Sequence, residues 1–236
     1  MRTEARHQLK QDRFAETAAE TYSWAVEHQS KLIYGGIAAA VILAVLVGAW
    51  AYMGRRSEQA GKALAGALNI YNAPVRPANV PAPPDMLTYA SSEERARAAH
   101  AEFEKVANEY SSTTPGKVAR YFAGITAKEL NDVSGAEKDL KEASGSGDKD
   151  LAALAQLALA GLYRDTNKNQ QAIDIYKQLI DHPTRSVSKS TAQLQLAELY
   201  QPTQPEEAAK LYDQIRKEDP QGVAAEIASQ NAGTMK

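Results

Sequence analysis

The feature that most constrains this chain is an apolar stretch without a charged residue near its N-terminus, Leu32 to Met53. The stretch has 22 residues, and an α-helix of that length extends roughly 33 Å at about 1.5 Å per residue. The hydrocarbon core of a bilayer is about 30 Å thick, so such a helix crosses it with a slight tilt. Tyr34, Trp50 and Tyr52 stand near its two ends, where aromatic rings favour the headgroup region. The sequence therefore predicts a transmembrane helix over residues 32–54.

Two other structures can contain a stretch of this kind. A buried helix of a large soluble protein seldom runs so long without a charge. The apolar region of a cleaved signal peptide is usually about 7–15 residues long and is followed by small residues. Here the stretch is longer, and Arg55 and Arg56 follow it. We therefore interpret it as an uncleaved anchor.

Small residues recur at every fourth position within the predicted anchor. They are Gly36, Ala40, Ala44 and Gly48. Small side chains at this spacing form a flat groove that a second membrane helix can approach closely. The alternative is that these residues are simply frequent in membrane helices.

Residues 1–31 are predicted to form a short tail with an amphipathic helix, because Phe14, Ala18, Tyr22 and Val26 recur every four positions. This helix would either lie on the membrane surface or a partner, or act as a stem leading into the anchor. The tail carries five basic and five acidic residues, which favours neither interpretation. Basic residues flank both ends of the anchor, so charge alone leaves its orientation open.

After the anchor, the sequence predicts a helix over residues 55–72 that continues out of the membrane. Five of the chain's ten prolines lie in residues 73–90, and each proline removes an amide donor and restricts the residue before it. We therefore expect an extended, proline-rich linker or a surface loop there. Residues 91–230 are predicted to form a helical repeat domain, and residues 231–236 a disordered tail. The sequence does not decide whether residues 55–72 pack against that domain.

Capping boxes, first-turn prolines and N-cap side chains mark the helix starts of the repeat domain. These signals are Ser91 with Glu94, Ser134 with Glu137, Pro115, Pro205, Asp148 and Asn169. They predict helices over residues 92–110, 115–130, 135–144, 149–165, 170–181, 187–200, 205–218 and 221–230. The short loops between them are typical of antiparallel hairpins.

Four of these helices share one spacing, in which an alanine is followed four positions later by a larger apolar residue. The pairs are Ala99 with Phe103, Ala136 with Leu140, Ala172 with Tyr176 and Ala208 with Tyr212, and the alanines are 37, 36 and 36 residues apart. Two helices need a small residue where they cross closely and a large one to fill the next gap. One hairpin cannot bury its apolar face alone, so this repeat predicts hairpins that stack.

The repeat resembles the tetratricopeptide repeat family in its alanine-to-aromatic step and in its closing prolines, Pro183 and Pro220. It departs from that family in lacking the first-helix tryptophan and in having a period longer than about 34 residues. The resemblance covers Ala96 to Pro220. It implies an α-solenoid of stacked helical hairpins, with residues 221–230 as a capping helix. Together with the anchor predicted from the apolar stretch, the expected fold is all-α, a single N-terminal transmembrane helix followed by this solenoid.

The layout of tail, anchor and repeats is similar to that of the YfgM-type ancillary subunits of the bacterial Sec translocon. Those subunits are anchored in the inner membrane with their repeats in the periplasm, and they associate with the translocon channel and periplasmic chaperones. The resemblance implies the same location for this chain, with a cytoplasmic N-terminus and with the Sec translocon, chaperones or their clients as partners.

No residue pattern indicates an enzyme, a cofactor or a metal site. The histidines His7, His28, His100 and His182 lack metal-ligand spacing. The chain has no cysteine, which excludes disulfides and thiolate chemistry. A net charge of −2 does not favour nucleic acid. We expect no small-molecule substrate.

The expected functional site is a protein-binding face on the first helices of the hairpins, apolar at its centre and charged at its margin. In the register of Tyr163 and Tyr200, this face consists of Val118, Tyr121, Ile125, Lys128, Leu154, Leu157, Arg164, Leu194 and Glu198. Alternatively, several of these residues pack beneath neighbouring helices. The leading hypothesis is a membrane-anchored scaffold. A cell-envelope or division coordinator, and a permanent accessory subunit of a larger membrane complex, are the alternatives.

Overall fold

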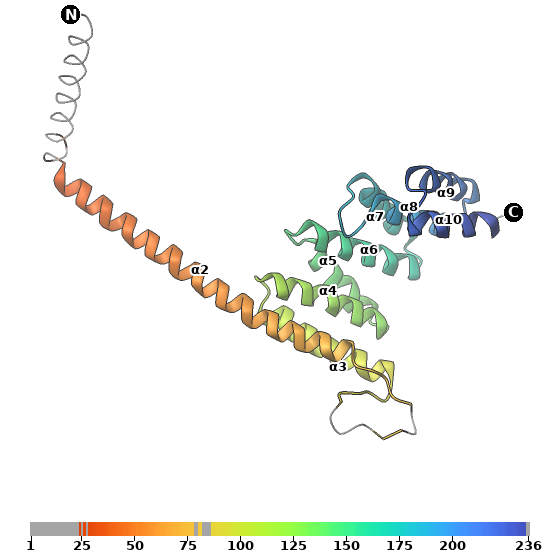
Figure 1. Ribbon diagram of the computed structural model, residues 1–236, viewed down its shortest axis with the longest axis horizontal. Coiled ribbons are helices and arrows are strands. Elements are labelled where there is room, and N and C mark those ends of the chain that lie inside the picture. The colour runs from red at the N-terminus through yellow and green to blue at the C-terminus, as the bar shows by residue number, and fades with distance from the viewer. Residues whose placement is uncertain (1–23, 25, 27, 78–79, 82–85, 235–236) are drawn as a thin grey trace, which may run out of the picture. The chain divides into compact units, whose positions relative to one another are not determined.

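A computed structural model of the chain describes residues 24, 26, 28–77, 80–81 and 86–234. Within these residues the secondary structure is helical, apart from one isolated bridge between Val75 and Tyr89. The all-α prediction is therefore confirmed (Figure 1). The chain divides into two compact units, Met1–Arg55 and Arg56–Lys236. The predicted amphipathic positions Phe14, Ala18 and Tyr22 lie outside the described residues, as do residues 235–236.

Apart from Trp24, Val26 and His28, the described part of the first unit is the N-terminal portion of helix α2, Gln29–Tyr71, which continues without a break into the second unit. The predicted anchor lies wholly within α2. Among the described residues, α2 is the helix long and apolar enough to cross a membrane, and none of its most apolar window is buried. Leu46 is 60% exposed and Trp50 is 79% exposed. This exposure excludes the interpretation of a buried core helix.

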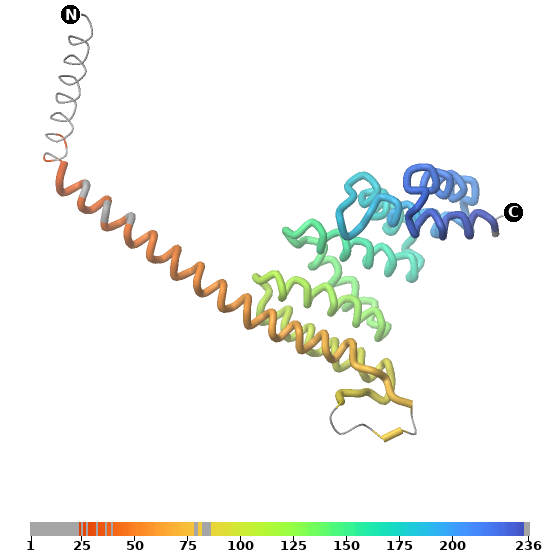
Figure 2. Tube along the Cα trace, viewed as in Figure 1, coloured from red at the N-terminus to blue at the C-terminus, as the bar shows by residue number. Residues whose placement is uncertain are grey.

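The second unit is a stack of helical hairpins in which each helix packs on the next along the chain (Figure 2). Its helices after α2 are α3 (Ser92–Glu109), α4 (Thr114–Glu129), α5 (Val133–Ser144), α6 (Lys149–Asp165), α7 (Asn169–Asp181), α8 (Lys189–Tyr200), α9 (Pro205–Glu218) and α10 (Val223–Thr234). Their bounds agree with the predicted helices within two residues, except that α10 extends to Thr234. The helix therefore includes four residues that we expected to belong to a disordered tail.

The end of α2 completes the first hairpin, which answers the question that the sequence left open. Ala67 is 1% exposed and packs in one apolar cluster with Ala99 and Phe103 of α3. At the start of the hairpin, Arg56 Nη2 donates to the Glu109 carbonyl oxygen at 2.6 Å. At its end, the Tyr71 ring meets the Phe103 ring edge-on, with the centroids 6.0 Å apart.

Residues 73–90 consequently connect the two helices of this first hairpin, which agrees with the loop and not with the linker among the two predicted alternatives. The ends of the loop are held together. Arg76 N–H donates to the Tyr89 carbonyl oxygen at 2.9 Å, and Tyr89 N–H donates to the Pro74 carbonyl oxygen at 3.1 Å. The proline count indicated a break in the helices but carried no information about which helices the break joins.

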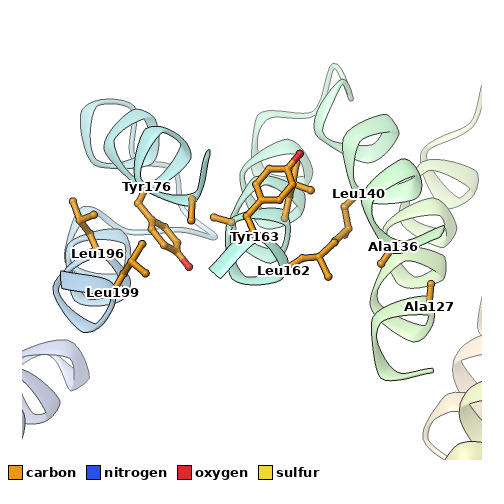
Figure 3. Close-up of a cluster of buried hydrophobic side chains, with 11 residues drawn as sticks. Ala127, Ala136, Leu140, Leu162, Tyr163, Tyr176, Leu196 and Leu199 are labelled. Atoms are coloured by element: carbon orange, nitrogen blue, oxygen red, sulfur yellow. The ribbon is translucent and has the colours of Figure 1, made fainter. Parts of the chain in front are cut away.

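The repeated pairs of an alanine and a larger apolar residue four positions later form the core between helices, as predicted. All eight residues of the four pairs are 0% exposed. Figure 3 shows Ala136, Leu140 and Tyr176 in the cluster that joins the second, third and fourth hairpins. Burying a large apolar side chain stabilises a fold by about 1.5–3 kcal/mol. The stack is therefore held by contacts that no single hairpin can supply.

Left-handed asparagines close the first helices of two hairpins. Asn131 and Asn167 both have φ 59°. In each turn the next amide bonds back to the helix: Asp132 N–H donates to the Ala127 carbonyl oxygen at 2.9 Å, and Lys168 N–H donates to the Tyr163 carbonyl oxygen at 2.8 Å. This Schellman-type pattern satisfies carbonyl groups that the helix end would otherwise leave free.

These turns also correct two of the predicted caps. Helix α5 is capped by Asp132, whose side chain accepts from Gly135 N–H, and not by Ser134. Helix α7 has Lys168 at its N-cap position without a side-chain hydrogen bond, and Asn169 is its first helical residue. In both cases the left-handed asparagine places the next residue directly before the helix. The caps predicted at Ser91 and Asp148 are confirmed.

Candidate partner-binding face

The nine predicted binding residues lie on α4, α6 and α8, the first helices of three consecutive hairpins. Eight of them are partly exposed. Leu194 is the exception, because it is 6% exposed and packs with Tyr212 and Ile215. We call the other eight residues the first-helix face.

The apolar part of this face is shared between the surface and the core. Tyr121, Ile125 and Leu157 pack against the cluster around Tyr163, and Leu154 packs against the cluster of Val187. Burial raises the pKa of Tyr121, which therefore stays protonated. Val118 belongs to none of the described core clusters. Packing between hairpins thus takes up much of the apolar surface that the sequence assigned to a groove.

The charged margin forms a connected network across three hairpins. Lys128 Nζ lies 2.7 Å from Asp165 Oδ2, which joins α4 to α6. Arg164 Nη1 donates to Gln195 Oε1 at 3.0 Å and lies 3.7 Å from Glu198 Oε2, which joins α6 to α8. Burial raises the pKa of Asp165, but Lys128 and Arg164 together outweigh burial, and the net effect is a lowered pKa. Positive and negative groups therefore alternate along the face.

Sequence reasoning missed Asp165 and Gln195 in this network. Both were visible as polar residues close to predicted ones, since Asp165 follows Arg164 and Gln195 stands three residues before Glu198. Spacing along one helix could not show that Asp165 pairs with a lysine of another hairpin. That pairing depends on how α4 and α6 are stacked.

Comparison with known proteins identifies the family. The sequence model of the tetratricopeptide repeat-like domain family matches residues 24–194, which is most of the chain. The chain belongs to that tetratricopeptide repeat-like family. The match begins before the apolar stretch and ends within α8, so it includes the apolar stretch together with the first three hairpins. No match was found among curated proteins or among solved structures.

In a tetratricopeptide repeat-like array, stacked hairpins present an extended surface for other proteins, and such arrays typically serve as non-catalytic scaffolds. The first-helix face combines apolar side chains with charged ones, because the partly exposed Tyr121 and Ile125 lie beside the network of Lys128 and Arg164. Within the described residues, no group of three or more metal-ligating side chains is present.

A second charged cluster, centred on Arg120, joins α3, α4 and α5 and contains none of the residues of the first-helix face. The Arg120 side chain is 8% exposed; its Nη1 donates to Asp139 at 3.1 Å and its Nη2 to Asn108 at 2.6 Å. Glu142 lies 3.3 Å from Arg120 Nε. Burial raises the pKa of Asp139 despite the neighbouring guanidinium. Because Arg120 is surrounded by acceptors, we read this cluster as a structural link between two hairpins.

Proposed function

We propose that this protein is a single-pass membrane scaffold whose tetratricopeptide-like array binds partner proteins through the first-helix face. The observation that carries this proposal is helix α2. None of its most apolar window is buried, and its last residues are the first helix of the array. One helix thus supplies both an anchor and a structural element of the binding domain.

The continuity of α2 also supports an anchor over a cleaved signal peptide. The 43-residue helix runs through the region after Met53 where a cleavage site would stand. That region contains Arg55 and Arg56 in place of small residues. Arg56 already contacts the end of α3, so the array begins within three residues of the apolar stretch.

The finer proposal places the protein in a bacterial inner membrane, with its N-terminus in the cytoplasm and its array in the periplasm. There it acts as an ancillary subunit of the Sec translocon and the periplasmic chaperone network. The support is the similarity of layout described above. The absence of cysteine is compatible with an oxidising compartment.

The mechanism of such a scaffold is tethering. An anchor confines the first-helix face to a layer next to the membrane, which raises its effective concentration near membrane-bound partners. Weak contacts with the array then give stable association without catalysis.

The binding face is tested by crosslinking in cells. A photo-crosslinking residue replaces Val118 or Glu198 on the face, and matched controls replace Lys138 or Lys177, which are exposed on the second helices α5 and α7. We expect adducts from the first pair and none from the second. A translocon subunit or chaperone in the adduct supports the finer proposal, and an envelope-assembly or division protein supports the alternative. Equal adducts from both pairs would contradict the assigned face.

The orientation is tested with single cysteines, because the natural chain has none. Gln8→Cys reports on the tail and Gln170→Cys on the array. In spheroplasts, an impermeant maleimide should label the second variant only. Labelling of the first variant alone would place the array in the cytoplasm and refute the proposed location.

The anchor's own contacts are tested by substituting Ala44 and Gly48 with leucine and purifying the protein in mild detergent. If the small residues of the anchor contact a membrane partner, this double variant recovers less of it. Val45 and Val47 substituted with leucine serve as the control. Unchanged recovery from the Ala44 and Gly48 variant would show that the anchor only holds the array at the membrane.

A further inference from the structure

A cavity of about 490 Å³ lies between the first turn of α3 and the end of α4, and the function proposed above does not use it. Its lining includes Ser92 and Arg95 of α3, together with Glu129 of α4 and Asn131. It lies at the end of the first hairpin where Tyr71 closes α2. None of the residues of the first-helix face lines it.

The charge that has no ion-pair partner on the α3 side of the cavity is positive. Arg95 is partly buried, and its guanidinium carbon stands 5.9 Å from the centroid of the Tyr71 ring. Its Nη1 has a long hydrogen bond of 3.5 Å to the Ala73 carbonyl oxygen, and its Nε is buried without a hydrogen-bond partner. Among the described residues, no carboxylate lies within ion-pair distance of Arg95. The N-terminus of α3 adds a positive dipole end at the same wall.

The α4 side of the cavity is negative. Glu129 is the last residue of α4, and its Oε1 accepts a hydrogen bond from Tyr71 Oη at 2.7 Å. No lysine or arginine in the described part of the chain forms an ion pair with it. The C-terminal carbonyl groups of α4 add the negative end of that helix dipole. Glu93, which also lines the cavity, is already paired with Arg97 at 2.6 Å.

Both charges stand where the helix dipoles disfavour them. A cation near a helix N-terminus and an anion at a helix C-terminus each lose stability, typically about 0.3–1 kcal/mol. A ligand that brings a carboxylate to Arg95 and an ammonium group to Glu129 would offset both unfavourable charge–dipole interactions at once. A simple anion bound to Arg95 would be repelled by Glu129, and a simple cation bound to Glu129 would be repelled by Arg95.

We propose that this cavity binds a small zwitterion that carries a free ammonium group and a free carboxylate, namely an α-amino acid or a short peptide. The ligand carboxylate binds the Arg95 guanidinium through charge-assisted hydrogen bonds. The ligand ammonium binds Glu129, which Tyr71 holds in place through its hydroxyl group. The site lies between the first and second hairpins, and none of the residues of the first-helix face lines it.

Titration calorimetry on the full-length chain in detergent micelles tests the proposal. The probes are alanine, alanyl-alanine, N-acetyl-alanyl-alanine and alanyl-alanine amide. Alanine and alanyl-alanine separate a free amino acid from a peptide as the natural source, and binding of either one supports the site. Removal of either ligand charge should weaken binding of the dipeptide at least tenfold.

Substitutions assign the two charges to their protein partners. Glu129→Gln keeps a hydrogen-bond acceptor for Tyr71. It should weaken the binding of free alanyl-alanine about as much as acetylation of the dipeptide's ammonium group does. For the acetylated probe the same variant should bind like the natural chain, because the two losses remove one interaction. Arg95→Gln should behave in the same way toward the amidated probe. Glu226→Gln on the exposed side of α10 is the control and should leave every affinity unchanged.

Absence of binding to alanine and alanyl-alanine at millimolar concentrations would overturn the proposal. So would a doubly blocked dipeptide that binds as tightly as the free one. Thermal unfolding of each variant shows whether it is folded. If Arg95→Gln does not fold, the amidated probe on the natural chain still decides whether the carboxylate is recognised.

Discussion

Single residues show how one repeat position can carry different chemistry. Tyr176 and Tyr212 occupy equivalent places, and both are 0% exposed. The Tyr212 hydroxyl lies 3.3 Å from Gln201 Oε1 and 3.4 Å from Asn231 Nδ2. The Tyr176 hydroxyl is buried without a hydrogen-bond partner among the described residues. Burial, as the main cause, raises the pKa of Tyr176 to about 12. The repeat requires a large apolar side chain at this position, as Leu140 shows, whereas the presence of a hydroxyl group depends on the neighbours.

This difference predicts opposite effects of removing the two hydroxyl groups. Tyr176→Phe should leave the free energy of unfolding unchanged or raise it, because it removes a buried polar group that has no partner. Tyr212→Phe should lower it by about 1 kcal/mol through the lost hydrogen bonds. Substitution of either tyrosine by alanine should lower the free energy of unfolding by about 3–5 kcal/mol. Urea unfolding followed by circular dichroism measures all four variants. A larger loss for Tyr176→Phe than for Tyr212→Phe would contradict the assignment.

Glu137 is the carboxylate with the clearest predicted effect on how the stability of the fold depends on pH. Hydrogen bonds from Lys141 and Lys168, with a smaller one from Tyr163, lower its pKa to about 2. The folded pKa lies below the ordinary value of 4.5. The stabilisation is therefore fully present above the ordinary pKa and is lost as pH falls from about 5 to 2.

Replacement of Glu137 by glutamine should therefore lower the free energy of unfolding at pH 7 by about 1 kcal/mol. The difference from the natural chain should vanish near pH 2. Unfolding by urea at a series of pH values measures this. Glu58→Gln is the matched control, because its pair with Lys62 is mostly exposed and contributes little. A constant difference across the pH range would show that Glu137 acts through packing and not through its charge.

At the scale of the element, helix ends decide where each hairpin turns. Two cap predictions were wrong, at Ser134 and Asn169, although the helices themselves were found. A capping signal read from sequence indicates that a helix begins nearby. The preceding helix fixes the exact residue, because Asn131 and Asn167 continue its hydrogen bonds into the turn.

The left-handed asparagines give a prediction at this scale. Asn131→Gly should change the free energy of unfolding by less than about 0.5 kcal/mol, since glycine adopts a positive φ without strain. Asn131→Val should lower it by about 1–2 kcal/mol, because a β-branched side chain clashes there. The same pair of substitutions at Asn167 serves as an internal repeat of the experiment. Equal stability of the glycine and valine variants would contradict the proposed role of backbone strain.

For the whole molecule, the decisive element is α2, because it contains both the predicted anchor and the first helix of the array. Its final turns pack against α3 through Leu64, Ala67 and Leu68. Removing residues 56–90 would uncover this side of Phe103 and its neighbours. The charged and small residues on the outer side of α2, such as Lys62 and Gly66, are exposed and suit the end of a repeat stack.

Two fragments test whether the end of α2 is part of the array. Residues 56–236 should be soluble, helical and unfold in one cooperative transition. Residues 91–236 should unfold at a temperature at least about 5 °C lower, because the loss of the first helix costs several kcal/mol of buried apolar surface. Thermal unfolding by circular dichroism compares the two. Equal midpoints would show that α2 is an accessory to the array and not its first helix.

The sequence by itself determined the class of the protein. An uncharged stretch of 22 residues and four alanine steps at near-constant spacing leave few alternatives to an exposed apolar helix and stacked hairpins. These signals are local periodicities, and a periodicity along one helix shows which of its sides is buried.

Only the tertiary structure decided what each buried side packs against. It closed the first hairpin around residues 73–90, moved Leu194 from the predicted face into the core, and paired Lys128 with Asp165. It also placed Arg95 and Glu129 on opposite sides of one cavity, although they stand far apart in the sequence. The physical reason is common to all four cases: each depends on the distance between two helices, and a pattern within one helix carries no information about that distance.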